Sequence, residues 1–166
     1  MASRGSVYRR GATWTAHVSW GSGATKRQVK KGGYRTRKEA QAALTELLGS
    51  IDAGTFVTPS RLTLRRYLDD WLAGLATAGR RPTTIDRDGR MIGAYVPPRI
   101  GDVPLQQVSA LELDRLYATL ATEGRQRGGG GLSLRTVRYV HAILSKALGD
   151  AERKGLVARN VARRSS

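Results

Sequence analysis

The spacing of apolar residues changes from two to about 3.6 near residue 36. Over residues 13–20 apolar and polar residues alternate strictly, and the apolar members are Trp14, Ala16, Val18 and Trp20. A period of two is typical of a strand with one buried face. Segments 6–10 and 25–31 predict two further strands, so we expect a three-stranded antiparallel sheet whose last strand is broken by Gly32-Gly33.

A helix is predicted directly after the sheet. Thr36 and Glu39 have the spacing of a capping box, and Gly54 is the expected end of the helix. Its apolar stripe consists of Ala40, Ala43, Leu44, Leu47, Leu48 and Ile51. One helix buries only one face of a sheet, so the other face is left for solvent or a partner. The alternation places Trp14 and Trp20 under the helix, in a core and not on a base-stacking surface.

Beyond residues 58–61, a segment that contains Pro59, the pattern is helical throughout. Four apolar stripes at helical spacing begin near Thr63, Thr83, Ser109 and Ser133, and Gly155 ends the last. The glycine run 128–131 is expected to be a flexible, exposed linker. The predicted fold class is therefore an α+β amino-terminal domain, with three antiparallel strands on one helix, followed by an all-α four-helix bundle.

Charge changes this picture most. The chain has 29 Lys and Arg against 13 Asp and Glu, a net charge of +16, and its first acidic residue is Glu39. A folded surface of one sign indicates a polyanionic partner, and nucleic acid is the usual one. We expect no membrane segment, because no apolar run approaches eighteen residues. The amino terminus lacks the apolar core of a signal peptide, so we expect a cytoplasmic location.

The sequence offers little for catalysis or metal binding. Cysteine is absent, which excludes disulfides and thiolate ligands, and only His17 and His141 are present. Neither has a matching ligand or nucleophile, so a structural role is expected for both. Asp69 and Asp70 are adjacent on a helix and diverge by roughly 100°, which favours a solvated face over an acid/base pair. We expect no cofactor and no metal.

Three groups of basic and polar residues are candidate DNA contacts. The first group lies on the predicted strands, and a sheet can enter a major groove of DNA. The alternative is that this sheet face is solvated and that its lysines prevent aggregation through the sheet edges. Two adjoin helix amino termini, where backbone N–H groups, the helix dipole and arginine forks favour phosphate. The candidates are Arg9, Arg10, Lys26, Gln28, Lys30 and Arg35 in the sheet; Arg80, Arg81, Thr83, Thr84 and Arg87 at the second bundle helix; and Arg125, Arg127, Ser133, Arg135, Thr136 and Arg138 at the fourth.

Several blocks, in order, resemble the SAM-like core-binding domain of phage-type tyrosine recombinases (integrases). They are Thr84-Ile85, Pro98-Arg99-Ile100-Gly101-Asp102, Leu132-Ser133-Leu134-Arg135-Thr136-Val137 and the segment 155–160. The first half is similar to the arm-type DNA-binding domain that precedes the core-binding domain in many integrases. The residues that carry this similarity are Gly5-Ser6-Val7, Trp14, Lys26-Arg27, Gly33-Tyr34-Arg35-Thr36 and 54–57. The resemblance implies an arm domain at 1–57, a linker at 58–61, a core-binding domain at 62–160 and a tail at 161–166. The sequence departs from the family at Asp88, Tyr95 and Asn160-Val161.

The resemblance implies sequence-specific binding of double-stranded DNA, at the arm and core sequences of an attachment site, with other integrase protomers as possible partners. Neither histidine begins a His-x-x-Arg pair and no tyrosine can be assigned as the nucleophile. The catalytic domain of the family is therefore expected to be absent and this chain not to cut DNA. Two alternatives stay open: a truncated integrase that acts as a stand-alone DNA-binding regulator, and a basic RNA-binding protein.

Overall fold

The computed structural model of the chain describes residues 4–22, 24, 26–125 and 128–165. The chain forms two compact units, Met1–Thr58 and Pro59–Ser166, and each is described here by itself. The division falls inside the segment 58–61 expected to be a linker. Part of that segment belongs to the second unit, because the Ser60 N–H donates to Gln106 Oε1 at 3.2 Å.

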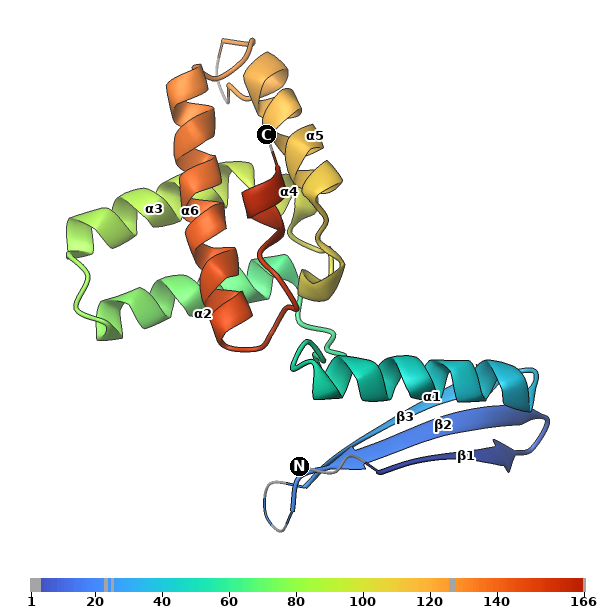
Figure 1. Ribbon diagram of the computed structural model, residues 1–166. Coiled ribbons are helices and arrows are strands. Elements are labelled where there is room, and N and C mark those ends of the chain that lie inside the picture. The colour runs from blue at the N-terminus through green and yellow to red at the C-terminus, as the bar shows by residue number, and fades with distance from the viewer. Residues whose placement is uncertain (1–3, 23, 25, 126–127, 166) are drawn as a thin grey trace. The chain divides into compact units, whose positions relative to one another are not determined.

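The first unit is a sheet covered on one face by a helix (Figure 1). Strands β1 (Arg4–Arg10), β2 (Thr13–Trp20) and β3 (Arg27–Tyr34) pair antiparallel in that order, and α1 spans Arg37–Asp52. The core beneath the helix consists of Ala16, Val18, Leu44 and Leu47. The capping box of Thr36 and Glu39 is present, as predicted. Trp14 and Trp20 are both half-buried, and Trp20 packs edge-on against Phe56 at this core.

The expectation that Gly32-Gly33 breaks the third strand is wrong. Ala16 pairs with Lys31 and Trp14 with Tyr34, so two glycines lie opposite Thr15. This β-bulge lets β3 continue to Tyr34, and Gly33 takes a φ of 94° that other residues avoid. The glycines therefore bend the strand without ending it.

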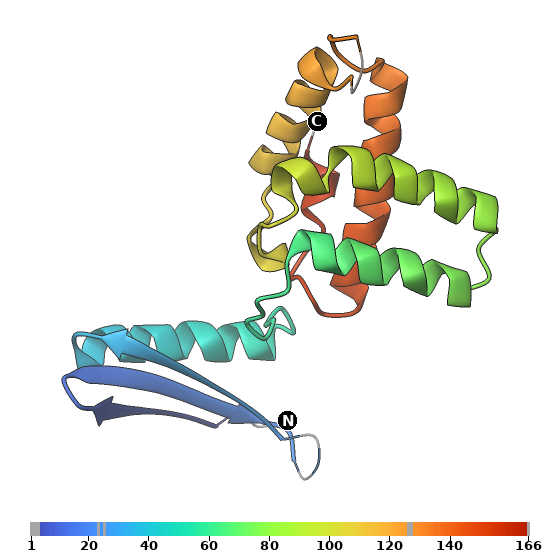
Figure 2. The ribbon, with the colours of Figure 1, turned by 180° about the vertical axis from the view of Figure 1, so that it is seen from behind.

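The second unit contains the four predicted long helices. They are α2 (Leu64–Thr77), α3 (Pro82–Tyr95), α5 (Ala110–Glu123) and α6 (Leu134–Arg153), with a one-turn α4 (Pro97–Ile100) and a 3₁₀ turn η2 (Leu105–Gln107) between α3 and α5. Within this unit α2 and α3 lie side by side and α6 crosses them (Figure 2). Fully buried leucines from three helices, Leu68, Leu113 and Leu144, join Ile92 of α3 in one core.

Two connections are more tightly packed than expected. Residues 161–164 form a 3₁₀ turn, η3 (Val161–Arg164), in which Ala162 is fully buried. Buried Asn160 holds this turn, because its Nδ2 donates to Ser145 O at 2.8 Å and its Oδ1 accepts from the Ala162 N–H at 3.0 Å. The segment expected to be a tail therefore packs on the helical unit.

The glycine run is not a free linker either. Gly128, Gly129 and Gly130 are exposed, but the Leu132 N–H donates to Leu120 O of α5 at 2.8 Å and Gly131 lies against the α5 backbone. The connection between α5 and α6 is thus fixed at its second end. In the part of the chain that the structure describes, no helix is long and apolar enough to cross a membrane.

Candidate nucleic-acid interface

The face of the sheet opposite α1 is polar and basic. Strand register identifies its members, because directly paired residues point to the same side. Ser6 and Lys30 both pair with His17, Gln28 pairs with Ser19, and Arg10 pairs with Thr13. We call this the open face; it consists of Ser6, Tyr8, Arg10, Thr13, Thr15, His17, Ser19, Gln28 and Lys30.

A hydrogen bond orders the centre of the open face. His17 Nε2 lies 3.4 Å from Gln28 Oε1, on the neighbouring strand. The polar structural role expected for His17 agrees with this contact. Histidine and glutamine can both hydrogen-bond base edges, so their position beside Lys30 gives the face polar groups as well as charge.

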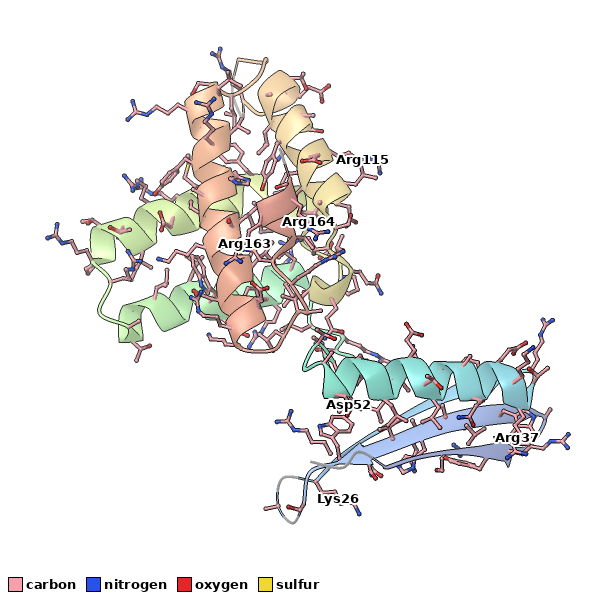
Figure 3. All side chains as sticks on the ribbon, viewed as in Figure 1. Lys26, Arg37, Asp52, Arg115, Arg163 and Arg164 are labelled. Carbon is pink, nitrogen blue, oxygen red and sulfur yellow. The ribbon has the colours of Figure 1, made fainter. Side chains whose placement is uncertain are left out.

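Not every predicted sheet residue lies on the open face. Arg9 pairs with Trp14 on the side of α1, and its Nε donates to Gly11 O at 3.2 Å. Arg35 follows β3, and its backbone N–H donates to Glu39 Oε2 at 2.9 Å. Lys26 lies directly before β3, two residues from Gln28, at the end of the unit opposite Arg37 (Figure 3). The structure thus gathers Arg10, Gln28 and Lys30 on one face.

In the helical unit, predicted residues of two helices meet at one groove. We call it the α3–α6 groove; it is lined by Arg87, Met91, Arg135, Thr136, Arg138, Tyr139 and Ala142. The Arg87 guanidinium lies over the Tyr139 ring, with Cζ 4.7 Å from the ring centroid. Among the ion pairs of the described residues, none involves Arg87, Arg135 or Arg138. The lining therefore combines three arginines that none of these ion pairs neutralises with the apolar side chains of Met91 and Ala142.

A carboxylate lies buried beside this groove. Asp88, only 8% exposed, accepts a hydrogen bond from the Tyr139 hydroxyl across the interface of α3 and α6. Burial raises the pKa of the Tyr139 phenol, and the hydrogen bond to Asp88 and its charge raise it further. The phenol therefore stays neutral and donates. Sequence reasoning singled out Asp88 but missed Tyr139, although Tyr139 lies four residues after Arg135 on the same helical face.

Helix caps occupy some of the other candidates. Ser133 Oγ accepts from the Thr136 N–H at 3.2 Å and contacts Thr136 Oγ1 at 2.9 Å. At the start of α3, by contrast, Arg81 makes no side-chain cap and Pro82 occupies the first turn. Thr84 is half-buried, whereas Arg80, Arg81, Thr83 and Arg125 are exposed; Arg127 lies outside the described residues.

His141 and Asp70, which the sequence analysis considered for catalysis, have structural contacts. His141 Nδ1 lies 3.3 Å from the Tyr117 hydroxyl, and burial raises the pKa of that phenol to about 12. Asp70 pairs with Arg66 at 3.3 Å on the exposed side of α2, as expected of a solvated face. Within the described residues no group of three histidines or carboxylates could hold a metal ion.

Comparisons with known proteins place both units. Residues 6–51 match the family of the Arm DNA-binding domain. Over 149 residues the chain is 32% identical to an integrase of Streptomyces ambofaciens, a match that covers 89% of this chain and 36% of the relative. The chain therefore spans about a third of the length of the curated relative that it matches.

Solved structures match the helical fold. The phage integrase SAM-like domain of Moorella thermoacetica is 28% identical, with a TM-score of 0.52 over 67% of this chain and 89% of that one. An integrase-like domain from Bacillus cereus is 21% identical, with a TM-score of 0.55 over 66% of this chain and 86% of that one, and supports the fold alone. These matches confirm the resemblance found in the sequence, an arm domain followed by a SAM-like domain.

Proposed function

We propose that this chain, whose first unit is an Arm DNA-binding domain and whose second is an integrase SAM-like domain, binds double-stranded DNA as the DNA-binding part of a site-specific integrase. The observation that carries the proposal is the coincidence of the matched domains with two cationic surfaces, the open face and the α3–α6 groove. Both surfaces present groups suited to phosphate and base edges.

The two surfaces have different chemistry. On the open face, Arg10 and Lys30 supply charge for phosphates, while Gln28 and His17 supply hydrogen bonds for base edges in a major groove. At the α3–α6 groove, Arg87, Arg135 and Arg138 contact the phosphates of a core site. Arg80, Arg81, Thr83 and Arg125 extend this basic surface at the neighbouring helix ends. Because one chain joins the units, binding of one raises the effective concentration of the other.

We further propose that residues 1–166 bind DNA but do not cut it, and that they act beside other integrase protomers on an attachment site in the cytoplasm. The sequence supports this, because neither His17 nor His141 begins the His-x-x-Arg pair that the resemblance implies for phosphoryl transfer. A nicking assay on supercoiled plasmid tests it; relaxation by the purified chain would refute it.

Binding is tested with the full chain on labelled duplex DNA, with single-stranded RNA of equal length as competitor. Replacing Arg135 and Arg138 together by alanine should weaken duplex binding about tenfold or more, because hydrogen bonds to charged groups contribute about 1.5–3 kcal/mol each. The melting temperature should hardly change, since both side chains are exposed. Arg115→Ala on α5 is the matched control for each single substitution, Arg135→Ala or Arg138→Ala, because it removes one charge away from the groove (Figure 3). Preferential displacement by RNA would favour the RNA-binding alternative.

A further inference from the structure

We propose that Asp88 and Tyr139 form a positioning pair that holds Arg87 at the α3–α6 groove in the orientation that meets a DNA phosphate. This inference rests on the proposed function and adds to it two residues whose role is to position Arg87. Three observations carry it: the hydrogen bond from Tyr139 to Asp88, the contact of the Arg87 guanidinium with the Tyr139 ring, and the place of Arg87 and Tyr139 on the lining of one groove.

The first step is the anchoring of the ring. Asp88 is one of three buried polar side chains among the described residues, and a buried carboxylate requires a partner. The Tyr139 hydroxyl supplies one from the facing helix. A phenol that donates to a buried carboxylate fixes both ends of the tyrosine, its Cα on α6 and its hydroxyl on α3. The ring between them therefore has a single orientation.

The second step is the stacking of the arginine. With Cζ 4.7 Å from the centroid, Arg87 is within the range of a cation–π contact. A cation–π contact leaves the charge of the guanidinium intact, and guanidinium N–H groups that the tyrosine does not engage can still donate. A phosphate can accept from those groups while the ring stays in place. Arg87 is thus preorganised without loss of its charge, and the entropy cost of ordering a long side chain is reduced on binding.

Charge alone makes the opposite prediction, which allows a sharp test. Asp88 is a negative group next to a DNA surface, so its removal should strengthen binding if it acts only through its charge. A positioning role predicts that Asp88→Ala weakens binding, because the ring loses its anchor. Asp88→Asn keeps an acceptor for the phenol and should bind at least as tightly as the wild-type chain.

The experiment is a double-mutant cycle on the full chain, with a 30-base-pair duplex of mixed sequence as the probe. Tyr139→Leu should raise Kd about two- to fivefold in the wild-type background, the value of an exposed cation–π contact. In an Arg87→Ala background it should change Kd by less than about twofold, because no guanidinium is left to position. Arg115→Ala serves as the control background, in which Tyr139→Leu should raise Kd by the same factor as in the wild-type chain.

A second measurement separates positioning from folding. In the free chain the Arg87 Nε–H should show a restricted NMR relaxation signature that Tyr139→Leu abolishes, while melting temperatures show whether the variants stay folded. Additive effects of the two substitutions, or tighter binding by Asp88→Ala, would overturn the positioning pair. Failure of the wild-type chain to bind any duplex would instead refute the proposed function, and a mobile Arg87 in the wild-type chain would refute the pair whatever the outcome with DNA.

Discussion

The last glycine of the run 128–131 should be about twice as sensitive to substitution by alanine as Gly129 in the same run. A Cβ added at Gly131 would lie 1.6 Å from the carbonyl oxygen of Ala121 and 2.3 Å from its carbonyl carbon. Real Cβ atoms essentially never approach closer than 3.0 Å, so the connection must move from 1.6 to 3.0 Å, a displacement of 1.4 Å. The contacted atoms belong to the backbone of α5 and cannot rotate away.

The magnitude follows from what that displacement breaks. The Leu132 N–H donates to Leu120 O at 2.8 Å, and loss of this bond costs about 1–3 kcal/mol because the Leu132 N–H is left without that acceptor, whereas Leu120 O keeps the Gly124 N–H as a donor. Leu132 also packs, half-buried, on the core, and partial exposure of such a side chain costs about 1 kcal/mol. We expect Gly131→Ala to destabilise the helical unit by about 2–4 kcal/mol, a fall in melting temperature of roughly 8–16 °C.

Gly129→Ala is the matched control in the same loop. Gly129 has a φ of 67° and nothing within 4 Å of an added Cβ, so only the left-handed backbone is penalised, at about 1–2 kcal/mol. Differential scanning calorimetry of the full chain, with far-ultraviolet circular dichroism to follow the helices, measures both variants. Equal losses of stability at the two positions would refute the argument from backbone contact.

Three further predictions concern binding, a helix cap and alkaline stability. The logarithm of the association constant for duplex DNA should fall with the logarithm of the salt concentration at a slope of roughly −5 to −9, as for about six to ten neutralised phosphates. A slope near zero, measured by fluorescence anisotropy, would exclude the basic faces as the binding surface. Thr36→Ala should destabilise the sheet unit by about 1 kcal/mol in denaturant unfolding, with Thr36→Ser as the near-neutral control. Because the folded pKa of Tyr117 is raised from 10.0 to about 12, its stabilising effect is complete below pH 10 and is lost as pH rises toward 12; Tyr117→Phe should flatten that loss of melting temperature, and an unchanged pH profile would contradict the assignment.

Local patterns predicted the elements because each has a local cause. The period of two fixed β2, and hydroxyl residues at the caps marked the starts of α1, α2, α5 and α6. The sequence did not predict which side chains of the outer strands lie on which face of the sheet. Whether Arg9 or Arg10 lies on the open face depends on the register of β1 against β2, which the turn sets and an alternation in one strand cannot show.

The α3–α6 groove could not be predicted from the apolar pattern of either helix alone. Arg87 and Arg135 were predicted separately, each from its own helix, but their meeting requires the crossing of α3 and α6. The same applies to Gly131. The glycine-rich composition of residues 128–131 suggests a flexible linker, but Gly131 lies against Ala121 of α5, ten residues earlier in the chain. In both cases the missing information is the distance between elements far apart in sequence.

The identity of the residue that contacts Asp88 determines how much charge the groove keeps for a ligand. If Asp88 were paired directly with Arg87, the carboxylate would be satisfied but the arginine would be neutralised toward a phosphate. A neutral donor avoids this, because Tyr139 satisfies Asp88 through its hydroxyl and meets Arg87 through its ring. The tyrosine thus transmits position from a buried anion to a surface cation without cancelling its charge.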